Sequence, residues 1–496
     1  MLDFTQSVQE MYICPPNSRI KIGGGEFSDC DLQWFERENG EDKAVLGANQ
    51  AVFTTPNYDK EGIYHYFLRA ADKSTGAVSK IYDFKVASTN LPTVFLETEC
   101  KTEEISKENY SKGSIRIIEW NDDFFCGEKN EFKIKGRGNS SWSQPKKGYN
   151  IKFDKKQSLF GLEKSKKWCL IANYSDKSLI RNKYASYLGN DIFNAEWNPH
   201  FVCIDFVFNG EYIGTYTLSE KIGIGTGRID IQDIADVEEY LSAGKTNKIT
   251  DTNSDGNKDL SDGGFVLEVD SRLDGDFAFK TSKNVPFVLK DPDEVSTDIQ
   301  EKVKEIVQNA EDVLYGDDFA NSESGWRKYI DESSIIDWYL TNEFCKNNDA
   351  IFFSSVYMYY NPTDSKLHLG PNWDFDISCG NVNYNDCDKT DGFWIKRAAW
   401  ISRMFEDSSF VSAVKSRWNE KKSEVYSSVV SQIQSMADDI EVSANANFTK
   451  WQILGTYVWP NADGYESRTT YQSEIDYLKS WCSKRYTWLD SAINAL

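Results

Sequence analysis

The first part of the chain alternates apolar and polar residues with a period of two. Segments 63–72 (IYHYFLRAAD) and 79–88 (SKIYDFKVAS) show this alternation, and the turn-rich stretch KSTGAV lies between them. Such alternation is typical of half-buried strands, and the short connection predicts a hairpin. Several short strands in so short a segment predict a small immunoglobulin-like β-sandwich at residues 1–92, an accessory domain with a spacing or binding role.

A second pattern begins after Leu91-Pro92, where strand-like segments surround one helical segment. Residues 178–192 repeat apolar side chains at the spacing of one helix face. The segments expected to form strands are 131–138, 148–153, 167–173, 202–214 and 215–222. The chain turns at Asn209-Gly210, and the first Gly-bounded segment runs on into the next strand, as in a meander. Residues 93–295 are therefore predicted to form a sheet-rich lobe, mostly antiparallel, with one inserted helix.

Helical periodicity dominates residues 298–345 and 395–496. In the first of these segments a Ser/Thr start precedes apolar residues at helical spacing, namely Ile299, Val303, Ile306 and Val307. The sequence therefore predicts an α+β protein. A sandwich at 1–92 precedes a larger domain at 93–496, whose helix-rich lobe spans 296–496.

The charge of the chain narrows the functions open to it. Its 496 residues include 56 Lys and Arg against 78 Asp and Glu, a formal net charge of −22. A surface this negative repels nucleic-acid phosphates and anionic lipid, although one local basic pocket is enough to bind a nucleotide. No apolar run of about 18 residues occurs, so we expect no membrane span. The N-terminal residues MLDFTQSVQE have no signal-peptide pattern, so the leader of an exported protein would be absent from this sequence.

Histidine and cysteine usage argues against the common zinc sites. The chain has 3 His and 10 Cys, with no C-x-x-C pair. Neither a His-rich zinc site, a zinc ribbon nor a thioredoxin-type dithiol is therefore expected. Cys169 and Cys203 lie in apolar strand-like runs and are predicted to be buried thiols. Two other pairs are close enough in sequence to bridge loops: Cys14–Cys30 and Cys379–Cys387.

Residues 251–262, DTNSDGNKDLSD, have the pattern of a twelve-residue calcium loop. Oxygen-bearing side chains at alternate positions wrap a hard cation, and Gly256 at position 6 permits the sharp turn. The predicted Ca²⁺ ligands are Asp251, Asn253, Asp255, Asn257 (through its backbone carbonyl), Asp259 and Asp262. The Asp at position 12, in place of Glu, makes the loop similar to dockerin-type loops, and the strand-like segment that follows indicates that the usual flanking helix pair is absent. An acidic solvated turn is the alternative; bound Ca²⁺ would be structural and would suit an extracellular protein.

The segment GRGNSSWSQPKKGYNIKF (136–153) has the composition of a phosphate-binding turn followed by a strand. Glycines allow the backbone to approach a phosphate closely, and nearby basic side chains supply positive charge. The side chains expected to contact a nucleotide here are Arg137, Lys146, Lys147 and Lys152. Glu220, in the strand-like LSEKI, could orient a lysine or shape the nucleotide pocket, and a surface salt bridge is the alternative.

Two acidic segments of the helix-rich lobe point to metal and proton chemistry. Asp374 and Asp376 form a D-x-D pair, which on a strand would send both carboxylates to one face as a platform for Mg²⁺ or Mn²⁺. Asp349 precedes a hydrophobic strand-like run and could lie beside this pair as a general base. With a basic phosphate cradle, these carboxylates suit phosphoryl transfer. Taken singly, each is more often a turn residue or a strand cap, so the prediction depends on their joint occurrence.

These segments resemble, in the same order, those of the CotH kinase family of atypical protein kinases, named for a spore-coat protein. The matching text is KGRGNSSW…PKKGYNIKF, DKSLIRNKYASYLGND, FVFNGEYIGTYTLSEKI, GGFVLEVD, NEFCKNNDAIFFSSVYMYY, GPNWDFDISCGN and WISRMFEDSSFVSAVKSRW. The resemblance covers residues 93–430. It implies a reduced, two-lobed protein-kinase-like fold that binds ATP with Mg²⁺ or Mn²⁺ and phosphorylates Ser on a protein substrate. It also implies that Asp349 is the catalytic-loop aspartate and Asp374 the metal-binding aspartate, with Asp376 as its companion.

The sequence departs from the family pattern at one place. Family members often have an Asn after the catalytic Asp as a second metal ligand, whereas this chain has Ser354-Ser355. A hydroxyl is a weaker Mg²⁺ ligand than an amide oxygen, so either one metal suffices or activity is impaired.

The leading hypothesis is a secreted or cell-surface kinase of bacterial type, whose partner is a protein substrate bearing Ser. Two other functions compete with it. A catalytically weak kinase-like scaffold, acting as a cell-surface adhesin or carbohydrate-associated module, would use exposed members of the 15 Trp and 26 Tyr for binding. Metal-dependent hydrolysis of a phosphoester would use the same carboxylates with a placed water instead of a substrate hydroxyl.

Overall fold

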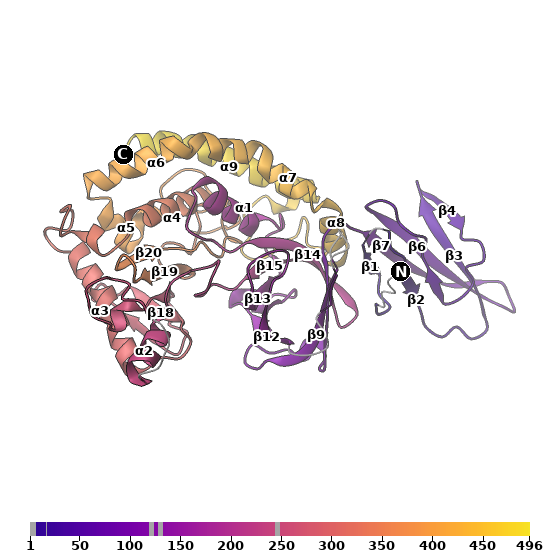
Figure 1. Cartoon of the computed structure of the whole chain (residues 1–496). Helices are drawn as coiled ribbons and strands as arrows, with labels where there is room; N and C mark the ends of the chain where they lie inside the picture. Colours follow the sequence, from indigo (N-terminus) through magenta and orange to yellow (C-terminus); the bar gives the residue numbers. More distant parts are fainter. Residues whose placement is uncertain (1–5, 16, 119–123, 127–131, 244–248) are drawn as a thin grey trace.

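Strands predominate in the first half of the chain and helices in the second, and one further sheet lies among the helices (Figure 1). A computed structural model describes residues 6–15, 17–118, 124–126, 132–243 and 249–496. Its architecture is mixed α+β, as the hydrophobic pattern predicted. No helix within these ranges is long and apolar enough to cross a membrane.

The N-terminal domain consists of a five-stranded sheet and a two-stranded sheet. The larger sheet has the order β1-β7-β6-β3-β4, and the smaller one pairs β2 with β5. The strands are β1 (Met11–Cys14), β2 (Lys21–Gly23), β3 (Cys30–Glu38), β4 (Glu41–Ala44), β5 (Val52–Thr54), β6 (Gly62–Asp72) and β7 (Val78–Ser88). The predicted hairpin is β6–β7, and it is antiparallel. The ring of Trp34 lies 5.1 Å from that of Phe84 and 5.5 Å from that of Phe53, so side chains of both sheets meet in one core.

The next strands close into a barrel. The sheet has the order β10-β9-β11-β12-β13-β15-β14-β8, and β8 also pairs with β9, which closes a ring of seven strands. The strands are β8 (Thr93–Thr98), β9 (Ser111–Ile118), β10 (Phe124–Cys126), β11 (Phe132–Arg137), β12 (Gly148–Gln157), β13 (Ser165–Ile171), β14 (Phe201–Phe208) and β15 (Glu211–Glu220). Alternate side chains such as Ile134, Ile151 and Trp168 fill the inside of the ring. The side chains between them therefore point outward.

A third sheet and most of the helices form the rest of the molecule. The order β17-β18-β16-β19-β20 combines strands from both sides of residue 295, where the sequence predicted the change of lobe. These strands are β16 (Phe265–Val269), β17 (Ala278–Lys280), β18 (Pro286–Asp291), β19 (Val356–Asn361) and β20 (Lys366–Leu369). Hydrophobic periodicity did not predict that the two lobes share this sheet, because β16 pairs with β19 across a long stretch of intervening chain.

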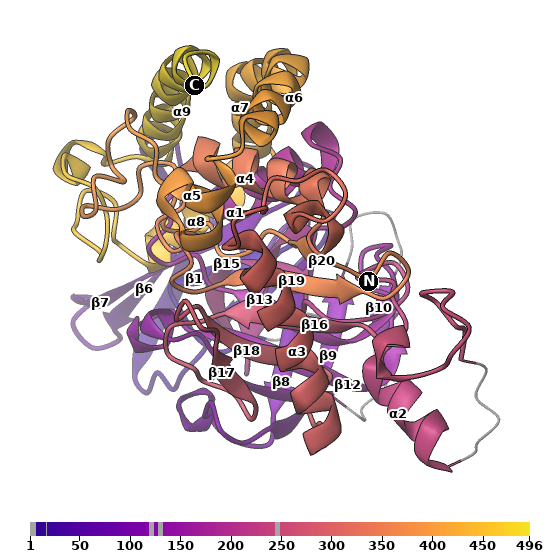
Figure 2. The same ribbon diagram turned by 90° about the vertical axis from the view of Figure 1, so that its left-hand side faces the viewer.

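The helices begin within the barrel region and dominate after residue 296. They are α1 (Arg181–Tyr187), α2 (Ile234–Ala243), α3 (Thr297–Leu314), α4 (Glu332–Cys345), α5 (Ala399–Met404), α6 (Ser408–Ser427), α7 (Ile433–Asp438), α8 (Glu441–Lys450) and α9 (Tyr471–Asn494). Ser296 caps α3, because its side-chain oxygen accepts a hydrogen bond from the Ile299 N–H. Helices α6 and α9 lie side by side in both views (Figure 1, Figure 2).

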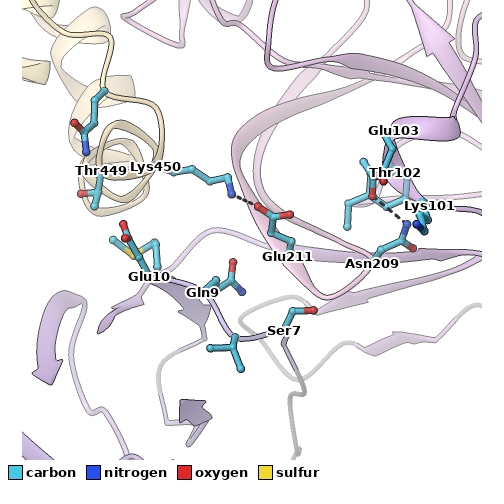
Figure 3. Close-up of a pocket in the computed structure, with 14 residues that line it drawn as sticks. Ser7, Gln9, Glu10, Lys101, Thr102, Glu103, Asn209, Glu211, Thr449 and Lys450 are labelled. Atoms are coloured by element: carbon cyan, nitrogen blue, oxygen red, sulfur yellow. Dashed lines mark hydrogen bonds and ion pairs between the residues drawn. The ribbon is translucent and has the colours of Figure 1, made fainter. Parts of the chain in front are cut away.

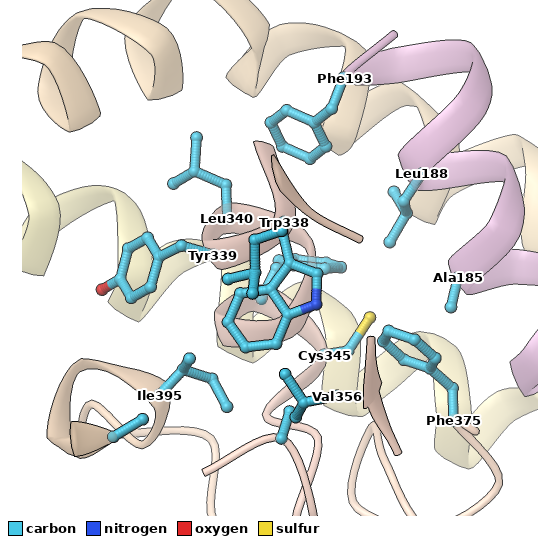
Figure 4. Packing of buried hydrophobic residues seen from close by; sticks show 14 of the residues in the cluster. Ala185, Leu188, Phe193, Trp338, Tyr339, Leu340, Cys345, Val356, Phe375 and Ile395 are labelled. Atoms are coloured by element: carbon cyan, nitrogen blue, oxygen red, sulfur yellow. The ribbon is translucent and has the colours of Figure 1, made fainter. Parts of the chain in front are cut away.

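A buried core around α4 holds the two loops that carry the predicted carboxylates. Trp338 of α4 packs among Leu188, Phe375 and Val356, which come from three different segments (Figure 4). At the end of α4, the carbonyl of Cys345 accepts a hydrogen bond of 2.7 Å from the N–H of Cys379. The loop after α4 and the loop after β20 are therefore held to the same core.

The nine cysteines whose side chains the structure describes are free thiols. Cys169 and Cys203 are buried, as predicted. The bridges that the sequence spacing allowed do not form. Cys14 lies in β1 and Cys30 begins β3, and β7 and β6 separate these strands in the sheet. Cys379 faces the thiols of Cys345 and Cys482.

A buried carboxylate joins the N-terminal domain, the barrel and α8. Asp205 of β14 accepts hydrogen bonds from the hydroxyls of Thr89 (2.7 Å), Tyr212 (3.2 Å), Thr215 (3.2 Å) and Ser443 (2.7 Å). Burial raises the pKa of Asp205, and the four hydroxyls act in the opposite direction. Since Thr89 comes from the connection between domains and Ser443 from α8, this carboxylate ties three parts of the chain together.

We expect the substitution Asp205→Ala to lower the free energy of unfolding by about 3 kcal/mol, because it leaves the buried hydroxyls of Thr89, Tyr212 and Ser443 without their acceptor. The Thr215 hydroxyl keeps the Ser443 carbonyl as an acceptor. Denaturant unfolding of the purified variant measures this loss. The control is Asp317→Ala, at an exposed position after α3, for which a change within about 0.5 kcal/mol is expected. Equal stability of the two variants would contradict the role of Asp205.

Candidate functional site

A cavity of about 1040 Å³ lies between the outer wall of the barrel and the helix-rich region. Strands β11, β12 and β13 form one wall, and the loops after α4 and β20 form the other. The charged residues of these walls include Arg137, Lys221, Lys290, Asp349, Asp374 and Asp376. The cavity therefore brings together basic and acidic segments that lie far apart in the sequence.

The three predicted carboxylates of the helix-rich region all line this cavity. Asp349 lies in the loop between α4 and β19, as expected for a residue that precedes a strand. Asp374 and Asp376 do not lie on a strand, which corrects the interpretation of the D-x-D pair. They follow β20 in irregular chain, and Asp374 has a left-handed φ of 65°. Aspartate tolerates this conformation better than most residues, and such local strain is common at functional sites.

Ser354 and Ser355 hold two of the carboxylates. The Ser354 hydroxyl donates to Asp349 Oδ2 (3.2 Å), and the Ser355 hydroxyl donates to Asp374 Oδ2 (3.1 Å). The backbone N–H of Ser355 also donates to Glu268 Oε1 (3.1 Å). Ser354 and Ser355 therefore orient the carboxylates of Asp349 and Asp374.

Electrostatic repulsion between these acids favours a bound cation. Burial raises the pKa of Asp349, and the negative charge of Asp374 raises it further. Burial also raises the pKa of Asp376, and the charges of Asp374, Asp176 and Asp349 add to this effect. Carboxylate oxygens are the ligands that Mg²⁺ and Mn²⁺ prefer. The carboxylates of Asp374 and Asp376 are thus of the donor type that suits such an ion. Among the described residues, the group of three or more acidic, His or Cys side chains whose ligand atoms all lie within 4.8 Å of one another is that of Asp331, Asp364 and His368, which do not line this cavity.

Basic side chains face the same cavity from the barrel and the third sheet. Arg137 lies over the ring of Trp373, with its guanidinium carbon 5.4 Å from the ring centroid. Lys221 and Lys290 also line the cavity, and Lys290 is paired with Glu268 at 2.9 Å. Arg272 lies close to Asp349 and pairs with Asp270 at 3.1 Å. These positive charges suit a phosphate-bearing ligand.

Sequence reasoning missed Lys221, Lys290 and Arg272. Lys221 stands in the segment LSEKI, directly after Glu220, and Arg272 follows two residues after the segment GGFVLEVD. Lys221 lies at the end of a segment that was predicted to be a strand, and Arg272 follows another. A single basic residue at the end of a strand is usually exposed to solvent, so neither residue indicated a ligand contact by its position alone. Their common position depends on barrel closure and on the pairing of β16 with β18, which spacing alone does not reveal.

Two other predicted nucleotide contacts, Lys146 and Lys147, lie outside the residues that line the cavity. The ammonium group of Lys146 donates to the carbonyl of Thr215 (2.5 Å) and to Asn447 Oδ1 (2.8 Å). Burial lowers the pKa of Lys146 well below its usual value. The ammonium group of Lys147 donates to the carbonyl of Trp142. Both lysines precede β12 and donate to acceptors of the protein itself, a backbone carbonyl in each case and also the Asn447 side chain for Lys146.

Lys152 and Glu220 are also not among the side chains that line the cavity. Lys152 lies on the outer face of β12, two residues from Asn150, which does line it. The buried carboxylate of Glu220 accepts a hydrogen bond of 2.8 Å from the backbone N–H of His200, and it also faces the His200 ring. Of the predicted basic contacts, the structure therefore places Arg137 alone in the cavity wall, among the described residues.

A smaller cavity of about 650 Å³ lies where the N-terminal domain, the barrel and α8 meet (Figure 3). Lys450 of α8 pairs with Glu211 there, and the Asn209 side chain donates to the Thr102 hydroxyl (3.0 Å). The first pair joins α8 to the barrel, and the second lies within the barrel region, so these polar groups already have partners in the protein. The carboxylate-lined cavity is therefore the better candidate for chemistry.

The family comparison agrees with this choice. The family model of the CotH kinase protein matches residues 134–489, which include the basic wall at Arg137 and the carboxylates at Asp349, Asp374 and Asp376. The chain belongs to the CotH kinase family. The N-terminal domain lies outside the match. No curated protein matches the chain.

The predicted calcium loop lies between α2 and β16. Asp251 Oδ2 accepts a hydrogen bond from the Gly256 N–H (2.9 Å), and Asp262 Oδ1 accepts one from the Thr252 N–H (2.8 Å). Asp255 Oδ1 accepts one from the Asn257 N–H (2.7 Å). Asp251 Oδ1 is buried and, among the described residues, has no hydrogen-bond partner. Calcium binding by this loop remains a proposal, and the buried oxygen supports it.

If the loop holds Ca²⁺, we expect a calcium-dependent rise in the melting temperature, because an ion that binds the folded state stabilises it. This stabilisation is about 2.7 kcal/mol when free calcium exceeds the dissociation constant a hundredfold. Differential scanning calorimetry with calcium and with a chelator measures the effect. The rise should vanish in Asp251→Asn and persist in the control Asp236→Asn, at an exposed position in α2. Identical curves for the unmodified protein in both buffers would refute calcium binding.

Proposed function

We propose that this chain is a protein kinase that transfers the γ-phosphate of ATP to serine side chains of a protein substrate, with Mg²⁺ or Mn²⁺. The observation that carries the proposal is that Asp349 and Asp374 line the same cavity. The hydroxyls of Ser354 and Ser355 orient these two carboxylates. Arg137, Lys221 and Lys290 line the same cavity, so phosphates have positive partners there. Phosphoryl transfer needs this combination of metal carboxylates, a positioned acid–base group and a basic cradle.

The D-x-D segment and the donor chemistry of its carboxylates support a proposal for the residues that would hold the metal. Asp374 and Asp376 would bind it, and when bound the ion neutralises charge on the phosphates. Lys290 is kept in place by its pair with Glu268, whose other oxygen accepts the Ser355 N–H. The basic wall and the acidic loop are thus connected through one glutamate. We further propose that the barrel and the helix-rich region correspond to the two lobes of a reduced kinase-like fold.

Asp349 would act on the acceptor. In the transfer step the serine oxygen bonds to the γ-phosphorus, the bond to the bridging oxygen breaks, ADP leaves, and Asp349 takes the hydroxyl proton. Hydrogen bonds from Asn348 (2.8 Å) and Ser354 (3.2 Å) oppose the effects of burial and of Asp374 on the pKa of Asp349. They also fix the orientation of the carboxylate, which general-base geometry requires.

A binding role without catalysis is the second candidate, because exposed aromatic rings lie at the cavity. Trp459 is 47% exposed, and its ring stacks on that of Tyr384 with centroids 6.3 Å apart. Both residues line the cavity. Stacked, partly exposed rings suit a sugar-bearing or surface protein partner. Location outside the cell is proposed on the calcium loop, since such loops suit calcium-rich fluid.

Two substitutions should separate metal binding from transfer. Asp374→Asn removes a negative charge from the metal ligands, so we expect ATP–Mg²⁺ affinity to fall by about tenfold or more. Asp349→Asn keeps the metal ligands but removes the proton acceptor, so turnover should fall by about 100- to 10,000-fold while nucleotide affinity survives. Calorimetric titration and transfer of labelled phosphate to a serine peptide measure these two quantities.

The control is Asp317→Asn, an exposed carboxylate outside the cavity, which should behave like the unmodified protein. Release of free phosphate without labelled peptide would favour phosphoester hydrolysis. Absence of both nucleotide binding and transfer, with either metal, would refute the kinase proposal and leave the scaffold function.

A further inference from the structure

Five lysines stand side by side across the outer wall of the barrel. They lie on β9, β11, β12 and β13 and directly after β15: Lys112, Lys133, Lys152, Lys167 and Lys221. In the strand pairing Lys112 is opposite Lys133, Lys133 is opposite Lys152, and Lys152 is opposite Lys167. The backbone N–H of Lys221 donates to the carbonyl of Lys167 (3.3 Å). We call these five residues the lysine row.

The lysine row is the next rung of the sheet beside the candidate active site. Two residues further along β11, β12 and β13, on the same outer face, Lys135, Asn150 and Cys169 line the cavity. Lys221 lines it as well. Two residues of a strand span about 6.6 Å, so the row lies about that far from the cavity-lining residues of the same strands. Its Lys221 end lines the cavity, and the other four lysines lie beyond its margin.

Five neighbouring ammonium groups repel one another unless negative charges lie close to them. Like charges directly opposite each other destabilise a sheet. Within the described residues, the ion pairs of the row are Lys133–Asp154 at 3.8 Å and Lys167–Asp293 at 2.5 Å. Burial alone would raise the pKa of Asp293, but Lys167, Lys221 and Lys152 lower it. Among the described residues, two carboxylates therefore form ion pairs with ammonium groups of the five-lysine row, in a chain whose net charge is −22.

The length and position of the row indicate what kind of ligand fits. Four steps of about 4.8 Å between strands give about 19 Å, the length of about six residues of extended polypeptide. The cavity has basic groups for a nucleotide in Arg137, Lys290 and Arg272, and Lys221 belongs to both the cavity wall and the row. A long nucleic acid is repelled by the rest of the surface. A short anionic segment of a polypeptide meets only the local positive charge.

We propose that the lysine row binds an acidic or already phosphorylated segment of the acceptor polypeptide while the acceptor serine lies at Asp349. This inference rests on the proposed kinase function and adds a substrate class to it. Lysine suits this role because its ammonium group is a mobile point charge that accepts either carboxylate or phosphate. The kinase would then act best on serines that lie near negative charges, including serines phosphorylated in earlier turnovers.

The test compares three fluorescent peptides, each with one acceptor serine. One has a flank of aspartates, one a flank of phosphoserines, and one a neutral flank. Anisotropy without ATP measures binding, and initial rates with ATP and Mg²⁺ measure transfer. We expect either anionic peptide to bind about tenfold or more tightly than the neutral one, and salt to reduce this preference. The stronger of the two anionic flanks identifies the source of the negative charge.

The variant is Lys112→Glu combined with Lys133→Glu, because neither residue is among those that line the cavity. The matched control is Lys155→Glu combined with Lys166→Glu, two exposed lysines of β12 and β13 outside the row. The row variant should lose the preference through a higher KM for anionic peptides, with kcat and neutral-peptide activity unchanged. The control should keep it. Retained activity on the neutral peptide shows that the row variant is folded.

Three results would overturn the inference: no preference in the unmodified protein, a preference that survives in the row variant, or equal loss in the control. If anionic peptides bind through the row but no peptide is phosphorylated, the docking surface stands and the kinase function fails. If all three peptides are phosphorylated equally, the kinase function stands and the docking surface fails.

Discussion

Three carboxylates that repel one another, those of Asp349, Asp374 and Asp376, face one cavity, and much of the surrounding structure serves to keep them there. Burial and mutual repulsion raise the pKa values of Asp349 and Asp376. Hydrogen bonds from Ser354 and Ser355 hold the carboxylates of Asp349 and Asp374 in place. An arrangement of this kind is unfavourable without a cation and favourable with one, which is the property that a metal-dependent phosphoryl-transfer site requires.

The surrounding fold keeps these carboxylates in place despite their repulsion. The loops that carry the acids leave α4 and β20, and the core around Trp338 holds both. The closed barrel supplies a rigid basic wall on the other side, because a ring of paired strands has no free edge along which to slip. Asp205 joins this wall to α8 and to the N-terminal domain. The positions of acids and bases relative to each other are thus set by packing far from the cavity.

Local sequence patterns predict much of this arrangement. Several features that they did not predict depend on contacts between distant segments. The β6–β7 hairpin, strands β11, β12 and β13 and the start of α3 follow from local signals, and the Asn209-Gly210 turn has the two positive φ values, 49° and 81°, that its residue types favour. No segment was predicted for β8 or β9, and the predicted segment 202–214 spans both β14 and the start of β15. Asp349 and Asp374 stand out through their neighbours in the chain. Barrel closure by β8, the burial of Lys146 against Asn447 and the lysine row depend on which distant strands pair, and no local pattern encodes that register.

The most direct test of the central claim is a crystal structure of the full chain with Mg²⁺ and a non-hydrolysable ATP analogue. The account predicts a metal ion bound by Asp374 and Asp376, phosphates beside Arg137 and Lys290, and Asp349 facing the terminal phosphate across an open acceptor position. Nucleotide bound instead at the joint between Gln9, Glu211 and Lys450, or phosphates with no metal at Asp374, would contradict it.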